Sequence, residues 1–122
     1  MDPFAQTIAP DLARLAPLRR ELSKWLEQAG VADPPRADLV LATHEAAANA
    51  MEHGNPDQAF EVTGTIVDHV LTVEISDTGH WEGKRLGSYE RGRGLMLIEC
   101  LVTRMEIVTG RAGTTLRLVQ RL

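Results

Sequence analysis

The sequence predicts an α+β protein in which helices cover one face of a mixed, mostly antiparallel sheet. Two observations lead to this fold class. Two helix-periodic segments come early, and two pairs of strand-like segments follow, separated by a loop and one more helix. Each strand pair is joined by a tight turn, which is typical of antiparallel neighbours. The resulting order, β-α-α-β-β-loop-α-β-β, is expected to pack as a two-layer α/β sandwich.

The first half of the chain holds two predicted helices. A short strand is expected around 4–8. In "ARLAPLRRELSKWLEQAG" apolar residues recur at helical spacing, and Gly30 stands just past the expected end. "VADPPR" breaks the pattern because prolines disfavour helix in the residues before them. A second helix is expected over 37–53. The apolar face of the first helix consists of Leu15, Leu18, Leu22, Trp25, Leu26 and Ala29.

The second half holds four predicted strands. Segments 60–67 and 71–77 are rich in β-branched residues and are separated by "DH", so they read as a hairpin. Segment 78–92 has no clear period and contains four glycines, which is typical of an irregular loop. A helix over 93–104 and two strands, 105–110 and 114–122, joined by "RAG", complete the chain.

Length and composition limit the classes of protein. The 122 residues, 43% of them hydrophobic, suit a single domain over 1–122. No long apolar run or signal peptide is visible, so we expect a cytoplasmic protein without a membrane segment. The net charge of −4 argues against a nucleic-acid partner. The single cysteine, Cys100, is expected to be a small buried hydrophobe.

The second predicted helix carries a polar face. At about 100° per residue, Glu45, Asn49 and Glu52 fall within roughly 60° of one another, and His53 lies further round. The opposite, packing face is expected to hold Val40, Ala47 and Met51, with Leu39, Ala46 and Ala50 beside them.

Three familiar metal- or nucleotide-binding motifs can be excluded, one on this helix and two later in the chain. "HEAAA" begins like a zinc-protease helix, but Ala48 stands where the second histidine is needed, so His44 is expected on the surface or in helix packing. "GRAGTTL" lacks the lysine of a Walker loop, and "GRGLML" lacks the third glycine of a dinucleotide fingerprint. What remains is an amide oxygen suited to Mg²⁺ at Asn49 and a carboxylate, Glu45, that can take a proton from an attacking hydroxyl.

Three later motifs offer binding groups. "DTG" ends a strand with Asp77, which can accept a hydrogen bond from an exocyclic amine such as that of adenine, and Gly79 lets backbone approach a flat ring. "GTTL" offers threonine hydroxyls. "ERGRGLMLI" precedes a helix whose N-terminal amides can hold phosphate. Taken singly, each motif is also an ordinary turn, strand start or loop.

In this order, "EAAANAMEHG", "DTG", "RGRGLMLI" and "GTTL" resemble the ATP-binding (Bergerat) fold of the GHKL superfamily, which gyrase, histidine kinases and heat-shock chaperones share. The likeness is greatest to the small anti-sigma-factor serine kinases of bacterial partner-switching systems, and it covers residues 11–122. A full histidine kinase is the weaker match, because no helical hairpin with a phosphoacceptor histidine is seen.

The resemblance implies an ATP- and Mg²⁺-dependent protein serine kinase. Asn49 would be the Mg²⁺ ligand and Glu45 the general base. The implied substrate is a serine of a STAS-type anti-sigma-factor antagonist, and the other implied partner is a sigma factor held inactive. Monomer and homodimer both stay open. The residues implied to contact nucleotide are Asn49, Asp77, Gly79, Arg91, Gly92, Arg93, Gly94 and Thr115, with Thr114 as the alternative to Thr115 and Leu95 packing below the site.

Two departures favour an alternative function. Trp81 replaces the second glycine of the family's D-x-G-x-G box, and the loop 80–90 is short for an ATP lid. Both features resemble kinase-like domains fused to stress-response phosphatases and sensor modules, so the chain is also interpretable as a domain excised from a larger regulator. The alternative function is a binding module of the same fold with little or no phosphoryl transfer.

Overall fold

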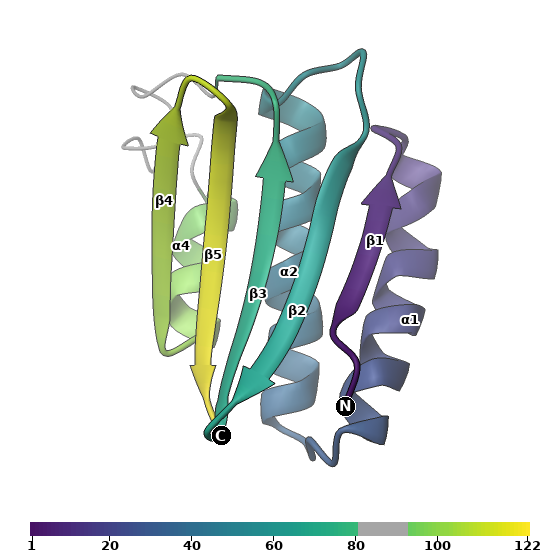
Figure 1. The fold of residues 1–122 in the computed structure, drawn as a ribbon, viewed down its shortest axis with the longest axis vertical. Coiled ribbons are helices and arrows are strands. Elements are labelled where there is room, and N and C mark those ends of the chain that lie inside the picture. The colour runs from purple at the N-terminus through teal and green to yellow at the C-terminus, as the bar shows by residue number, and fades with distance from the viewer. Residues whose placement is uncertain (81–92) are drawn as a thin grey trace.

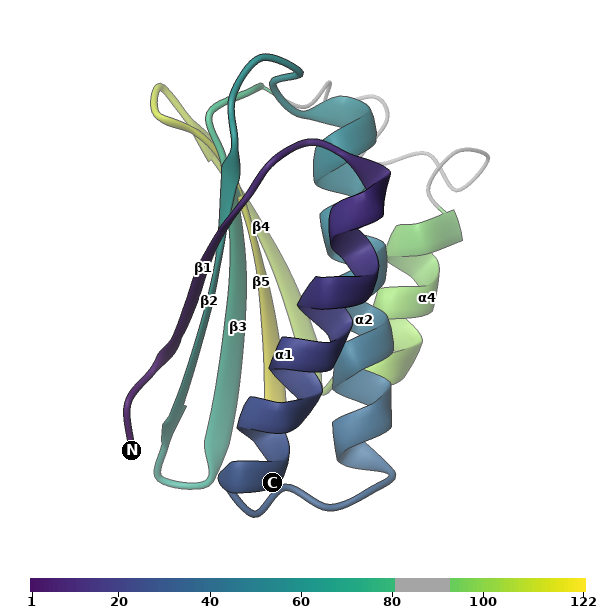
Figure 2. The same cartoon turned by 90° about the vertical axis from the view of Figure 1, so that its right-hand side faces the viewer.

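The protein forms two layers, a five-stranded sheet and a layer of helices on one of its faces (Figures 1 and 2). The structure is a computed structural model, and it describes residues 1–80 and 93–122. The described elements are β1 (Phe4–Ile8), the short 3₁₀ helix η1 (Leu12–Arg14), α1 (Leu15–Gln28), α2 (Pro35–His53), β2 (Phe60–Val67), β3 (Val70–Asp77), α4 (Arg93–Leu101), β4 (Arg104–Gly110) and β5 (Gly113–Arg121).

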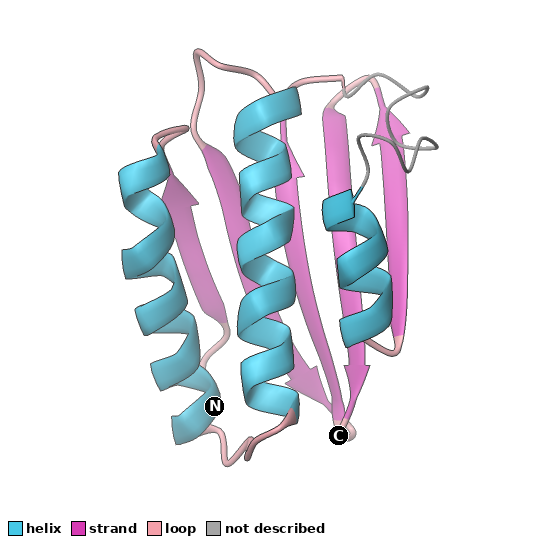
Figure 3. Cartoon of the chain, turned by 180° about the vertical axis from the view of Figure 1, so that it is seen from behind, coloured by secondary structure: helices cyan, strands magenta, loops and turns pink. Residues whose placement is uncertain are grey.

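The strand order is β1-β2-β3-β5-β4, and each of the four described pairings is antiparallel. The predicted α+β sandwich is therefore confirmed, with helices α1, α2 and α4 side by side on one face of the sheet (Figure 3). The end of α2, the end of β3 and the start of β5 lie at one end of the molecule, whereas both termini lie at the other (Figure 1). Because β5 is inserted between β3 and β4, residues 37 to 51 positions apart in the sequence meet there.

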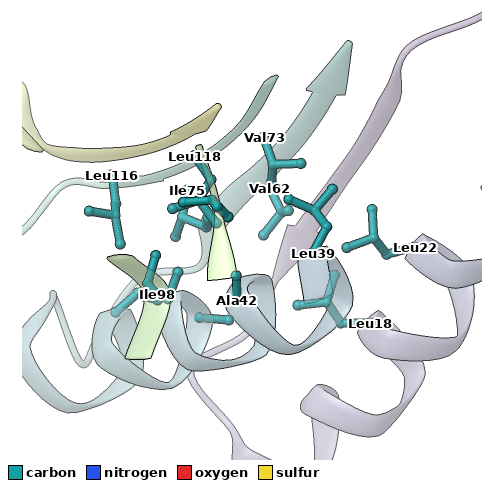
Figure 4. Packing of buried hydrophobic residues seen from close by; sticks show 14 of the residues in the cluster. Leu18, Leu22, Leu39, Ala42, Val62, Val73, Ile75, Ile98, Leu116 and Leu118 are labelled. Carbon is teal, nitrogen blue, oxygen red and sulfur yellow. The ribbon is translucent and has the colours of Figure 1, made fainter. Parts of the chain in front are cut away.

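Large apolar side chains from both layers fill the space between sheet and helices. Leu22 and Leu26 of α1 and Leu39 of α2 are completely buried. Burying each such side chain contributes about 1.5–3 kcal/mol. Alanines on α2 let that helix lie close to the strands. Figure 4 shows this core, with Leu18, Leu22, Leu39, Ala42 and Ile98 facing Val62, Val73, Ile75, Leu116 and Leu118.

The packing face of α2 is rotated around the helix from the predicted one. Val40 and Met51, expected near its centre, lie half-buried at its margin, and the buried face is centred on Leu39, Ala46 and Ala50. It also includes two residues that the periodicity did not single out, Ala42 and Thr43.

The boundaries of two helices differ from the prediction. α2 begins at Pro35, two residues before the predicted start, because proline fits the first turn of a helix, where its missing N–H has no partner to lose. α4 ends at Leu101 rather than at 104. The reason is tertiary, since the backbone N–H of Thr103 donates to the Gln120 side chain and the Thr103 hydroxyl accepts from Arg121 N.

The expectation for Cys100 was wrong, because its side chain is exposed. α4 turns Leu95 and Ile98 into the core. Cys100 follows Ile98 by two positions, which is about 200° around a helix and therefore on the solvent side. Among the described residues, no helix has both the length and the hydrophobicity needed to cross a membrane.

Candidate functional site

The polar face of α2 contains a buried amide that has no hydrogen-bond partner among the described residues. Glu45 and Asn49 lie one turn apart, and both are half-buried. The Asn49 Nδ2 atom is buried, and it makes no hydrogen bond with any residue that the structure describes. A buried donor without an acceptor costs about 1–3 kcal/mol, so this atom is a strong candidate for contact with a ligand.

His53 is a further candidate residue of this site, and the sequence motifs did not single it out. Its side chain is 9% exposed, and its Nδ1 atom is also buried without a hydrogen-bond partner in the described parts of the chain. It lies one turn after Asn49, and its Nε2 is 3.8 Å from a carboxylate oxygen of the exposed Glu52. The spacing of four residues from Glu45 to Asn49 and from Asn49 to His53 is the signal that could have identified it.

The neighbouring His44 has a structural role. Its Nδ1 accepts a hydrogen bond of 2.9 Å from the Arg19 guanidinium, which has only donors. This contact joins α2 to α1, so the expectation of helix packing for His44 is confirmed.

The buried carboxylate of Asp77 connects the end of β3 to the loop after α2. Asp77 is 4% exposed, and its Oδ1 accepts backbone hydrogen bonds from Asn55 at 2.8 Å and from Gly79 at 2.5 Å. The Oδ2 atom accepts no hydrogen bond from the described residues, so Oδ1 alone holds the backbone in this part of the chain.

Glycines allow the close packing around this carboxylate. A Cβ atom on Gly54 would overlap with the Asp77 carboxylate. On Gly79 it would lie 2.6 Å from Asn55 N and 2.8 Å from Asp77 Oδ1, closer than side-chain carbons approach such atoms. Gly79 therefore has a packing role in addition to the predicted one.

The two threonines of "GTTL" lie on opposite faces of the sheet. Thr114 is the cross-strand partner of Asp77, is 1% exposed and donates its hydroxyl hydrogen bond to the Gly79 carbonyl at 3.0 Å. Thr115 pairs with Ser76 and contacts its hydroxyl at 3.0 Å on the side away from the helices. Successive strand residues alternate between faces, so the structure brings Thr114, rather than the first choice Thr115, to Asp77.

The expected phosphate-binding segment is only partly described. Arg91, Gly92, Trp81 and most of the loop 80–90 lie outside the described residues. Arg93 and Gly94 form the first turn of α4, whose N-terminal amides carry partial positive charge. Leu95 is 4% exposed and belongs to the hydrophobic core, as expected of a packing residue.

Comparisons with known proteins identify the family and the fold. A family model for the histidine kinase-like ATPase domain matches residues 8–120. The crystal structure of the RsbU and RsbW domains of Rv1364c from Mycobacterium tuberculosis superposes on the whole chain, with a TM-score of 0.82 and 26% identity. The chain spans 33% of that longer protein.

A second structure shares the fold at lower sequence similarity. It is the histidine kinase domain of the blue-light activated histidine kinase EL346 from Erythrobacter litoralis. This domain is 14% identical to the chain and has a TM-score of 0.60. The match covers 88% of this chain and 61% of that structure. On the family match over nearly its full length, the chain belongs to the histidine kinase-like ATPase domain family.

Proposed function

We propose that this chain is an ATP-dependent protein serine kinase that also acts as an anti-sigma factor, phosphorylating a STAS-type antagonist and sequestering a sigma factor. One observation carries the nucleotide part of the proposal. The two buried nitrogens without partners in the described chain, Asn49 Nδ2 and His53 Nδ1, lie one turn apart on α2. Ligand oxygens, such as those of phosphates, would satisfy both.

Adenine recognition is assigned to the end of β3. Asp77 Oδ2 would accept a hydrogen bond from the exocyclic amine, while Oδ1 keeps its backbone partners Asn55 and Gly79. Thr114 holds the Gly79 carbonyl and so fixes the turn beside the carboxylate. The phosphates would extend toward α2 and toward the segment from Arg91 to Gly94.

The residues present fit a magnesium ion. Mg²⁺ uses few protein ligands and completes its coordination with water and phosphate oxygens. Asn49 supplies a suitable amide oxygen, and no cluster of three acidic, histidine or cysteine side chains that could hold a metal alone occurs in the described ranges. When bound, the ion would neutralise charge on the phosphates.

Phosphoryl transfer in this site depends on positioning and on one proton acceptor. Glu45 would take the proton from a substrate serine hydroxyl as its oxygen bonds to the γ-phosphorus. The bond from the γ-phosphorus to the bridging oxygen breaks, and ADP leaves with that oxygen. The phosphoserine gains about 1.5–2 negative charges, which disfavours its complex with this chain of net charge −4.

Glu45 gives the sharpest test. Incubation with γ-labelled ATP, Mg²⁺ and a STAS-type antagonist should yield phosphoserine, and Glu45→Gln should bind ATP normally but slow transfer by about 10²–10⁴. Glu27→Gln, on the exposed surface of α1, is the matched control. Absence of phosphoserine with every antagonist tested, in a chain that binds ATP, would contradict the kinase assignment.

A second candidate function is a non-catalytic binding module of the same domain. It is favoured by Trp81, which replaces a glycine of the family's adenine box. The same incubation separates the two candidates, because a binding module retains the sigma factor or the antagonist without forming phosphoserine. In both cases we propose that 1–122 acts as one ATP-binding domain.

A further inference from the structure

A pocket of about 470 Å³ lies on the open face of the sheet, the face away from the helices. Its floor is a row of direct cross-strand partners, one from each of four strands: Glu61 of β2, Ser76 of β3, Thr115 of β5 and Val108 of β4. The turn between β4 and β5 leans outward on this side (Figure 2) and adds a wall. We refer to this site as the open-face pocket.

The charge in the open-face pocket is unbalanced. The Glu61 carboxylate forms no ion pair or hydrogen bond with any part of the chain that the structure describes. In the neighbouring row of the sheet the acidic side chains are neutralised, since Arg117 bonds Glu74 at 3.0 Å and lies 3.8 Å from Glu106. Glu61 is therefore the carboxylate on this part of the face that is available to a cation.

Apart from Asp77, which is itself buried, the other residues that line the open-face pocket are neutral. The Ser76 and Thr115 hydroxyls bond to each other at 3.0 Å, so they form a satisfied polar floor that can still accept hydrogen bonds. Ala59 and Ala112 line the pocket beside Val108, which is 51% exposed, and these three provide apolar contact. Small-molecule sites commonly have this size and this combination of apolar walls with a few polar groups.

We propose that the open-face pocket binds a guanidinium or ammonium group on a short apolar stem, with Glu61 as its counter-charge and Val108 against the stem. A charge-assisted hydrogen bond to Glu61 would orient the cation. The two sources of such a group are an arginine or lysine side chain in a peptide and a free alkyl cation.

The open-face pocket shares backbone with the candidate nucleotide site. Gly113, at a φ of +129°, lies so close to β3 that a Cβ atom would overlap with the Asp77 carbonyl oxygen. Asp77, Thr78 and Thr114 thus border the pocket on one face of the sheet, while the Asp77 and Thr114 side chains are buried toward the other. The proposal does not depend on nucleotide binding.

The test is an NMR titration of the isotope-labelled full chain, without nucleotide. The probes are N-acetyl-arginine methylamide, the singly charged n-butylguanidine and, as the uncharged analogue, N-acetyl-norleucine methylamide. We expect saturable shifts at the amides of Ser76, Thr78 and Thr115 with the two cations and at least tenfold weaker binding of the norleucine probe. Tighter binding of the arginine amide than of n-butylguanidine identifies a peptide side chain as the source, and the reverse order identifies a free alkyl cation.

Two variants make the test specific. Glu61→Gln keeps the shape of an exposed side chain and should raise the Kd for the cations about tenfold or more. Glu27→Gln removes the same charge from α1, outside the pocket, and should leave the Kd unchanged. The proposal is overturned if neither cation gives saturable shifts, or if Glu61→Gln binds them as tightly as the unchanged protein does.

Discussion

Asp77 Oδ1 accepts the backbone N–H of Asn55 at 2.8 Å, which ties the loop after α2 directly to the end of β3. The same oxygen also accepts the N–H of Gly79. A single carboxylate oxygen therefore holds together two segments that are 22 residues apart in the sequence, and we propose that the second oxygen, Oδ2, binds adenine.

Because the two oxygens of Asp77 have different predicted partners, Asp77→Asn should lower ATP affinity while changing stability little. The asparagine Oδ1 can keep both backbone bonds, while its NH₂ replaces the free oxygen with a donor that repels the adenine amine. We expect ATP affinity to fall about 10- to 100-fold, since a hydrogen bond to a charged group contributes about 1.5–3 kcal/mol, with a small change in unfolding free energy. Calorimetry with ATP measures this affinity, and Asp57→Asn, in the exposed loop after α2, is the control. Equal ATP affinity in Asp77→Asn would remove the adenine assignment.

The two threonines of the last strand form a matched pair. Thr114→Val removes the hydroxyl that bonds the Gly79 carbonyl, whereas Thr115→Val makes the same chemical change on the opposite face. We expect Thr114→Val to weaken ATP binding by about tenfold, consistent with one lost hydrogen bond, and Thr115→Val to leave it unchanged. Competition with a fluorescent ATP analogue measures both. Equal losses of ATP affinity in the two variants would contradict the assignment of Thr114, rather than Thr115, to the nucleotide site.

Asn49→Ala should separate folding from ligand binding. Because Nδ2 is buried without a partner in the described chain, its removal should not lower the unfolding free energy of the ligand-free protein. The unchanged protein should gain about 2.7 kcal/mol from Mg-ATP at a hundred times its Kd, and Asn49→Ala should gain almost nothing. Thermal unfolding with and without Mg-ATP provides the measurement, and Gln28→Ala, at the exposed end of α1, is the control. A full Mg-ATP gain in Asn49→Ala would exclude Asn49 as a ligand residue.

His53→Phe should loosen nucleotide binding without loosening the fold. Phenylalanine keeps a planar ring in a side-chain position that is 9% exposed, and it removes the unsatisfied Nδ1. Replacing an unpaired polar group with an apolar group of similar shape is nearly neutral or stabilising. We expect ATP affinity to drop about tenfold, as for the loss of one hydrogen bond, while Glu52→Gln next to it has no effect. The contrary result is unchanged ATP affinity in His53→Phe, measured by calorimetry.

The turn between β2 and β3 offers a stability prediction. Asp68 and His69 occupy positive φ angles of 51° and 63°, a conformation in which asparagine and glycine are preferred in two-residue hairpins. The double substitution Asp68→Asn with His69→Gly is therefore expected to raise the unfolding free energy by about 1 kcal/mol, because positive φ is costly for most side chains. Urea denaturation should show a higher midpoint with the same slope. An unmoved midpoint would mean that this turn carries no strain.

Local sequence patterns predicted most of the helices and strands and part of the candidate site. The β-branched composition of 60–67 predicted β2 at its observed limits, and the spacing of the leucines predicted the buried face of α1. The same local patterns placed Glu45 and Asn49 on one side of a helix and put Asp77 at a strand end. These features depend on side chains a few residues apart, so the sequence alone carries them.

Only the tertiary structure decided which residues meet. The register of β3 against β5 selects Thr114 over Thr115, and a shift of one residue would have reversed that choice. The rotation of α2 on the sheet buries the ring of His53 and leaves Glu52 exposed, and the orientation of α4 exposes Cys100. The choice between the two threonines follows from strand register, which is fixed by contacts between segments far apart in the chain. For His53 and Cys100 the helical spacing gives the angle between residues, and only packing against the sheet decides which face of each helix is buried.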